Sequence, residues 1–189
     1  MTNIDKALQI AFEMHKGQKR KCNNSPYITH ILDVASLLLA EPDATEEMVI
    51  AGILHDTLED TGYTANQLKT DFGQAVLDLV LFATESHKDA DTTIQEKKAT
   101  WKSRKQHTLD ACATATDQQL MIVLADKVAN LRNIKDDLLI YGDTIWNHFN
   151  ASHDDIMWYY SSLQKILNEK HGINRLLTLY NNLISEIFE

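Results

Sequence analysis

Apolar residues recur at three- and four-residue spacing along most of the chain, as in Ala7, Ala11 and Met14. Residues at this spacing lie on one face of an α-helix, so the pattern predicts amphipathic helices rather than strands. We expect helices at 3–17, 26–40, 45–60, 64–71, 73–87, 91–110, 115–134, 142–168 and 172–187. The sequence therefore predicts an all-α fold, a helical bundle of about eight to ten helices.

Only six glycines and two prolines interrupt this pattern. Pro26 suits the first turn of a helix, Thr45 is a plausible helix cap, and Gly73 separates two short helices. The chain has no composition break, internal repeat or long linker, so we expect residues 1–189 to form a single domain.

Composition is ordinary for a globular protein, with 44% hydrophobic and 24% charged residues. At 189 residues roughly two-thirds of the unfolded surface can be buried, so the core needs no disulfide or metal. Cys22 and Cys112 have no spacing that indicates a disulfide framework or a zinc finger. The amino terminus lacks the pattern of a secretory signal, and no apolar run approaches the roughly 20 residues of a membrane span. We expect a cytoplasmic protein without a membrane partner.

A net charge of −9 disfavours binding to a nucleic-acid polymer, because such binding depends on neutralising phosphates with basic residues. A small anion can still bind where positive charge is concentrated locally, as it is at Lys16, Lys19, Arg20 and Lys21. The simpler alternative is a solvated basic turn. The sequence is compatible with a monomer and with a homo-oligomer.

The most informative stretch runs from Ala51 to Asp60, AGILHDTLED. In a continuous helix His55 would lie one turn from Glu59, and Asp56 one turn from Asp60. Three adjacent carboxylates repel one another, so without a cation some should have a raised pKa. The alternative is a helical histidine with an ordinary structural role. The whole cluster after an apolar run favours a functional site, because such charges are costly to bury.

Two further stretches contain candidate ligands. Asp126 follows the apolar residues 121–125, with Asn130 one turn later, and His30 lies in an otherwise apolar helix. Taken alone, Asp126 would more simply pair with Lys127 or Arg132, and a lone histidine is more often structural. Two imidazoles and two carboxylates together form a nitrogen–oxygen set suited to Mn²⁺, Fe²⁺ or a similar ion.

The segment 89–105 is polar and charge-rich between two apolar helices. Its composition fits either a mobile lid or an exposed helix stabilised by charge pairs, and helix-surface composition favours the second interpretation.

The order His30, His55-Asp56, Asp126 resembles the HD superfamily of metal-dependent phosphohydrolases. Further motifs resemble the hydrolase domain of RelA/SpoT enzymes and stand-alone small alarmone hydrolases of the metazoan SpoT homologue type. The resemblance covers about residues 1–168, and its motifs are Arg20-Lys21, SPYITH at 25–30, LHDTLEDT at 54–61, Phe72-Gly73 and LADKVANLR at 124–132. The segment 88–116 departs most from the family pattern.

This resemblance implies an enzyme that hydrolyses guanosine tetraphosphate or pentaphosphate at the ribose 3′ position, releasing pyrophosphate. It implies Mn²⁺ as the usual metal, and a role in the stringent response. The implied metal ligands are His30, His55, Asp56 and Asp126. Glu59 and Asp60 would act on the attacking water. The implied substrate-binding residues are Arg20, Lys21 and Asn130, with looser matches at Arg104, Lys105 and Tyr159 or Tyr160.

Two other functions fit the same residues. An HD phosphatase acting on another nucleotide, such as NADPH, would have the same metal site but would release orthophosphate. A non-catalytic nucleotide sensor would lack a ligand or the Glu59-Asp60 pair, and both are present. The hydrolase of guanosine 3′-pyrophosphates remains the preferred interpretation.

Overall fold

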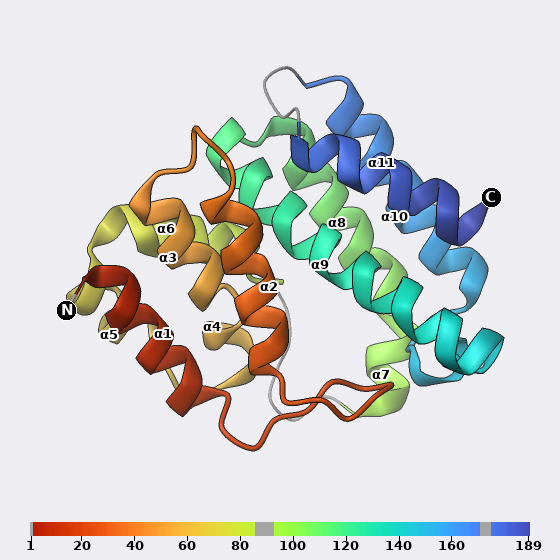
Figure 1. The fold of residues 1–189 in the computed structure, drawn as a ribbon, viewed down its shortest axis with the longest axis horizontal. Helices are drawn as coiled ribbons and strands as arrows, with labels where there is room; N and C mark the ends of the chain where they lie inside the picture. Colours follow the sequence, from red (N-terminus) through yellow and green to blue (C-terminus); the bar gives the residue numbers. More distant parts are fainter. Residues whose placement is uncertain (1, 86–92, 171–174) are drawn as a thin grey trace.

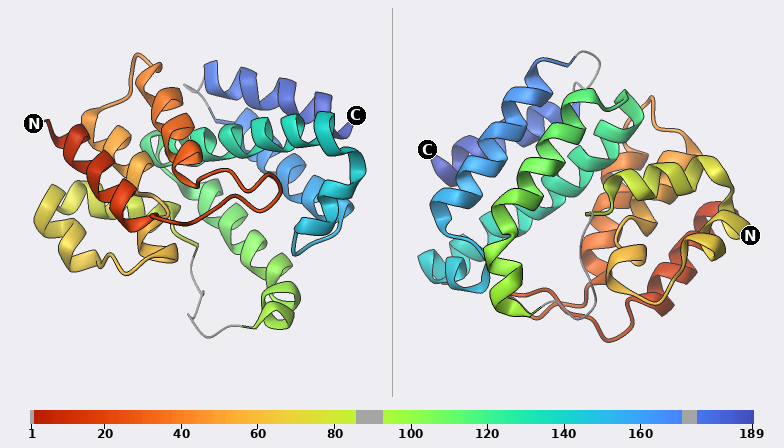
Figure 2. Two further views of the ribbon diagram at one scale, coloured as in Figure 1. Left: turned by 60° about the horizontal axis from the view of Figure 1, so that its bottom comes forward. Right: turned by 180° about the vertical axis from the view of Figure 1, so that it is seen from behind.

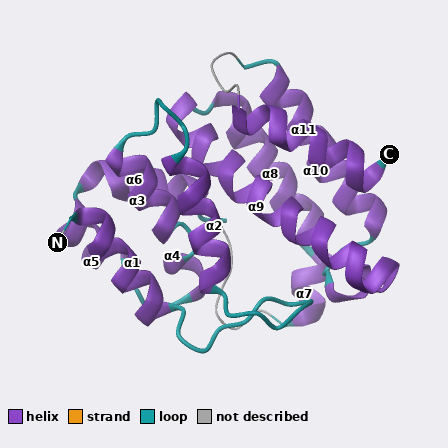
Figure 3. Cartoon of the chain, in the orientation of Figure 1, coloured by secondary structure: helices purple, strands orange, loops and turns teal. Residues whose placement is uncertain are grey.

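The computed structural model describes residues 2–85, 93–170 and 175–189, which fold into helices joined by loops (Figures 1 and 3). Within these ranges the only strand-like feature is an isolated bridge between Lys19 and Pro26. The all-α prediction is confirmed. The helices are α1 (Asn3–Met14), α2 (Ile28–Leu39), α3 (Glu46–Leu54), α4 (Thr57–Asp60), α5 (Ala65–Phe72), α6 (Gln74–Ala83), α7 (Ile94–Ala99), α8 (Trp101–Thr114), α9 (Asp117–Tyr141), the 3₁₀ helix η1 (Gly142–His148), α10 (His153–Asn168) and α11 (Arg175–Phe188).

Helix α3 lies at the centre of the amino-terminal half. Its residues 48–54 are all buried, because α1, α2, α6 and α9 pack around it. A helix that is apolar on every side is stable only in such a position. At Gly52 an added Cβ would lie 2.2 Å from Leu38 Cδ1, so glycine permits the close approach of α2 and α3. This approach brings the carboxyl end of α3 close to α2.

Helix α9 crosses the molecule and joins its two halves (Figure 1). Residues 120–125 are buried, and the helix packs against α2, α3 and α6 as well as α11. On the other side, α10 packs against both α8 and α11 (Figure 2). None of the described helices has the length and apolarity that a membrane span requires.

The predicted helix at 45–60 is wrong as a single element. Thr45 caps α3 as expected, its Oγ1 accepting from the Met48 amide at 3.3 Å, but α3 ends at Leu54. The His55 ring then bonds to the Gly52 carbonyl at 2.8 Å, and the Thr57 hydroxyl donates to the Leu54 carbonyl at 2.6 Å. These side chains occupy carbonyls that a continuing helix would use, so the chain turns before α4 begins.

Other boundaries also differ from the prediction. The helix expected at 91–110 is divided at Thr100 into α7 and α8, and the one expected at 142–168 is η1, a loop and α10. Helix α9 continues past 134 to Tyr141, where Gly142 ends it with a φ of +61°. Pro26 lies two residues before α2 rather than in its first turn.

Three predicted ends lie partly outside the described residues. Helix α6 ends at Ala83, short of the predicted 73–87, of which 86–87 are not described. Helix α11 covers 175–188, whereas residues 172–174 of the expected helix are not described. Part of the polar segment 89–105 is likewise outside these residues; its described part, from 93 onward, contains α7 and the start of α8.

Candidate metal centre

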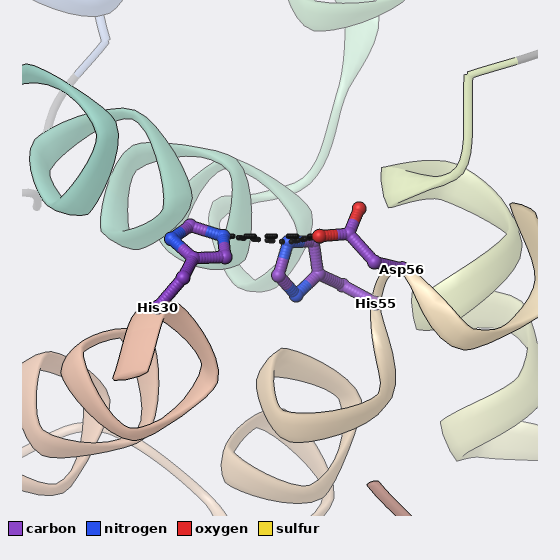
Figure 4. Close-up of side chains that lie close together, drawn as sticks. All are labelled: His30, His55 and Asp56. Carbon is purple, nitrogen blue, oxygen red and sulfur yellow. Dashed lines mark hydrogen bonds and ion pairs between the residues drawn. The ribbon is translucent and has the colours of Figure 1, made fainter. Parts of the chain in front are cut away.

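Two buried histidines face each other at the contact between α2 and the end of α3. His30 comes from the first turn of α2, and His55 directly follows α3. Their Nε2 atoms are 3.4 Å apart. Figure 4 shows both rings and the Asp56 carboxylate pointing toward one another.

Two carboxylates complete this group. Asp56 Oδ2 lies 2.9 Å from His55 Nε2 and 3.8 Å from His30 Nε2. Asp126 Oδ1, supplied by α9, lies 3.2 Å from His30 Nε2 and 3.6 Å from His55 Nε2. The structure thus brings together all four residues for which the sequence predicts a ligand role.

The orientation of His55 leaves a lone pair for a cation. Its Nδ1 can only donate to the Gly52 carbonyl, so in the neutral ring Nε2 is unprotonated and faces His30. The pKa of His30 is lowered because burial disfavours its charged form. Burial would also lower the pKa of His55, but Asp56 and Asp126 raise it well above the usual value. The two carboxylates therefore stabilise positive charge at the His55 ring.

The expected repulsion between carboxylates is relieved for Asp56. Burial alone would raise its pKa, but the adjacent His55 lowers it below the usual range. The pKa of Asp126 is also well below the usual value despite burial, because Lys127 Nζ lies 2.5 Å from its Oδ2. Asp60 does behave as the sequence indicates, since partial burial and the Asp56 charge raise its pKa.

The side chains of His30, His55 and Asp56 fit a divalent cation, with Asp126 next to both histidines. Buried imidazole nitrogens and carboxylate oxygens are the donors that Mn²⁺, Fe²⁺ and similar ions accept, and three of the groups, His30, His55 and Asp56, can reach one ion. An inward Nε2 with its Nδ1 fixed by a carbonyl is also the usual arrangement of a metal-binding histidine.

Glu59 and Asp60 do not extend the face of His55 and Asp56, because the helix is interrupted between them. Glu59 Oε2 accepts a bond from the Glu85 amide at 3.1 Å. Asp60 ends α4, and its carbonyl accepts from Gln18 Nε2 at 2.9 Å. The Asp60 carboxylate remains close enough to the cluster for the Asp56 charge to raise its pKa, as burial also does.

Arg20 and Lys21, the predicted substrate-binding residues of the loop before α2, have different surroundings. Arg20 Nη2 donates to Asn130 Oδ1 at 2.8 Å, and Asn130 Nδ2 donates to Asp126 Oδ1 at 2.6 Å. Arg20 is therefore connected to a candidate ligand through one amide. Lys21 is exposed, and its charge lowers the pKa of the nearby Asp60, which burial raises.

A cavity of about 220 Å³ lies beside Asp126, between α6, α8 and α9. Lys105 and Tyr159 line it, and the buried Tyr159 hydroxyl has no hydrogen-bond partner among the described residues. Arg104 does not line it but donates to Glu85 at 2.5 Å, and Glu85 also pairs with Lys105 at 3.0 Å. Tyr160 instead packs in the aromatic core, where its carbonyl accepts from Tyr180.

Two site residues were not given a role from the sequence. Tyr27 donates a hydrogen bond to Asp56 Oδ2, and the Glu85 amide donates to Glu59. Tyr27 lies inside a motif that carries the family resemblance, which is a signal that could have indicated it, whereas Glu85 lies outside these motifs. Lys127, one of the two partners that the sequence offered for Asp126, does pair with it.

The HD-domain family profile matches residues 7–156. A guanosine-3′,5′-bis(diphosphate) 3′-pyrophosphohydrolase, MESH1 of Xenopus tropicalis, is 35% identical over 134 residues, covering 70% of this chain and 69% of that protein. MESH1 of Drosophila melanogaster is 30% identical over 183 residues, covering 96% and 90%.

A solved structure is similar over nearly the whole chain. It is described as a metazoan ortholog of SpoT that hydrolyzes ppGpp, and it covers 98% of this chain and 96% of its own, with a TM-score of 0.74 and 26% identity. The chain also matches two Streptomyces proteins named GTP pyrophosphokinase, of which it spans 15% of the length.

Proposed function

Because this chain belongs to the HD-domain family, and within it to the group that contains the MESH1 pyrophosphohydrolases, we propose that it hydrolyses guanosine 3′,5′-bis(diphosphate). The products are GDP and pyrophosphate, and the pentaphosphate would give GTP. The single observation that carries the proposal is the convergence of His30 and His55 Nε2 at 3.4 Å, with two carboxylates beside them.

A divalent cation, with Mn²⁺ the proposed ion, would be held by His30, His55, Asp56 and Asp126. When bound, it supplies a Lewis acid that makes water more nucleophilic near neutral pH and offsets phosphate charge. The Asp126 side chain is held ready for this role by Lys127 and Asn130, at 2.5 Å and 2.6 Å.

Glu59 is the proposed general base. Its Oε2 accepts a hydrogen bond from the Glu85 amide, and a carboxylate held in this way can accept a proton from water. The water oxygen forms a bond to the phosphorus attached to ribose O3′, and the bond from that phosphorus to O3′ breaks. O3′ leaves with a proton as the hydroxyl of GDP. Asp60, whose pKa is raised by burial and by the Asp56 charge, is the proposed second acid–base group.

Local positive charge would hold the substrate against the net charge of −9. Arg20 and Lys21 lie on the loop before α2, and Lys105 lines the cavity beside Asp126. We assign Arg20, Lys21 and Asn130 to nucleotide binding, with Lys105, Arg104 and Tyr159 around the cavity. These cations can hold the two diphosphates, which the nucleotide carries on its ribose 3′ and 5′ oxygens.

A panel of nucleotides tests this proposal. Wild type and His55→Ala are incubated with Mn²⁺ and guanosine tetraphosphate, pentaphosphate, GTP or NADPH, and phosphate-containing products are separated by chromatography. We expect pyrophosphate from the two 3′-diphosphates with wild type only. Orthophosphate as the primary product from NADPH, with no cleavage of the 3′-diphosphates, would support the phosphatase alternative instead.

A further inference from the structure

The Tyr27 hydroxyl donates a hydrogen bond to Asp56 Oδ2. This is the oxygen that lies 2.9 Å from His55 Nε2 and 3.8 Å from His30 Nε2. We propose that Tyr27 is a positioning residue, which holds Asp56 Oδ2 toward the two imidazoles so that a cation can bind there. The inference rests on the proposed metal centre and adds a residue to it.

Asp56 needs such a partner because the backbone amides at the start of α4 could compete for its carboxylate. It occupies the cap position that precedes α4, where aspartate side chains commonly accept backbone amides of the first helical turn. Its carboxylate makes no such bond here. Tyr27 therefore supplies a donor on the side of the histidines, and the carboxylate turns away from the helix end.

Tyr27 can direct Asp56 only if its own ring is fixed, and contacts on several sides fix it. The ring stacks on His15, with centroids 4.9 Å apart and planes at 28°. It meets the His30 ring edge-on at 5.6 Å, and the Arg20 guanidinium lies 5.7 Å from its centroid. The Tyr27 amide donates to the Gln18 carbonyl at 2.9 Å.

The loop before α2 thus supports both acidic ligands. Tyr27 reaches Asp56 directly, while Arg20 reaches Asp126 through Asn130. A carboxylate oxygen has two lone-pair directions, so Oδ2 can accept from the phenol and still face the cation. Partners of this kind typically change metal affinity about 10- to 100-fold.

The test compares Tyr27→Phe with a matched control, Tyr63→Phe. Tyr63 is also a tyrosine that donates to an aspartate, reaching Asp71 Oδ2 at 2.7 Å, but it lies outside the site. Calorimetric titration of the metal-free full chains with Mn²⁺ measures the dissociation constant without nucleotide. We expect it to rise about 10- to 100-fold in Tyr27→Phe and to stay unchanged in Tyr63→Phe.

Kinetics supply a second readout that general destabilisation would not produce. In Tyr27→Phe the half-saturating Mn²⁺ concentration should rise, while KM for the nucleotide and kcat at saturating Mn²⁺ stay near wild type. Wild-type Mn²⁺ affinity in Tyr27→Phe, or equal weakening in both variants, would overturn the proposal. A wild type that binds Mn²⁺ but cleaves no guanosine 3′-diphosphate would refute the proposed function alone. A wild type that binds no divalent cation would refute both.

Discussion

Replacing Glu59 with glutamine isolates the role of one charge. The substitution keeps the shape of the side chain. It also keeps an oxygen that can accept from the Glu85 amide, which lies 3.1 Å from Glu59 Oε2 in the wild type. Only the proton-accepting carboxylate is lost. A general base contributes about 10²- to 10⁴-fold to rate, or about 2.7 to 5.4 kcal/mol of activation free energy. We therefore expect kcat to fall by that factor while the protein retains its Mn²⁺.

The assay is single-substrate kinetics at saturating Mn²⁺, with metal content measured on the same preparation. Glu96→Gln is the matched control, because the Glu96 carboxylate likewise accepts a backbone amide, that of Thr93 at 2.8 Å, on an exposed helix. It should have wild-type kcat. A Glu59→Gln protein with near-wild-type kcat would refute the general-base assignment. Stoichiometric loss of metal would instead make Glu59 a ligand.

Three other predictions follow from the same geometry. His55→Ala should abolish turnover and Mn²⁺ binding while circular dichroism shows largely unchanged helix content; full activity with bound metal would remove this residue from the site. Arg20→Ala should raise KM by about tenfold or more, and kcat should fall much less, because the lost contact acts in ground and transition states alike. Steady-state kinetics measure both constants, and a fall in kcat with unchanged KM would contradict this assignment. Burial raises the pKa of the Cys112 thiol to about 11, so at about pH 8 only about one thiol in a thousand is the reactive thiolate. Ellman's reagent should label half-buried Cys22 first and Cys112 only after denaturation, and rapid labelling of both would disprove the burial argument.

Hydrophobic periodicity predicts most of the helices, because most of them bury one apolar face against their neighbours, although α3 is buried on every side. It does not predict the break after Leu54. That break depends on the His55 ring and the Thr57 hydroxyl occupying the carbonyls of Gly52 and Leu54. Apolar spacing carries no information about such side-chain bonds, and residues 45–60 continue the helical pattern without interruption.

The candidate site was predictable in residue type but not in arrangement. His30, His55, Asp56 and Asp126 are recognisable from their order in the sequence. Their convergence depends on the close approach of α2 and α3 at Gly52 and on the path of α9. The hydrogen bond from Tyr27 to Asp56 is a further tertiary contact, 29 residues apart in the chain, that no local pattern indicates.

The central claim is that water attacks the phosphorus attached to ribose O3′. Hydrolysis of guanosine tetraphosphate in oxygen-18 water, with Mn²⁺ and a timed quench, tests it directly by mass spectrometry of the separated products. We expect intact pyrophosphate that carries one oxygen-18 atom and GDP that carries none. Oxygen-18 in the nucleotide product, or labelled orthophosphate as the primary product, would contradict the account.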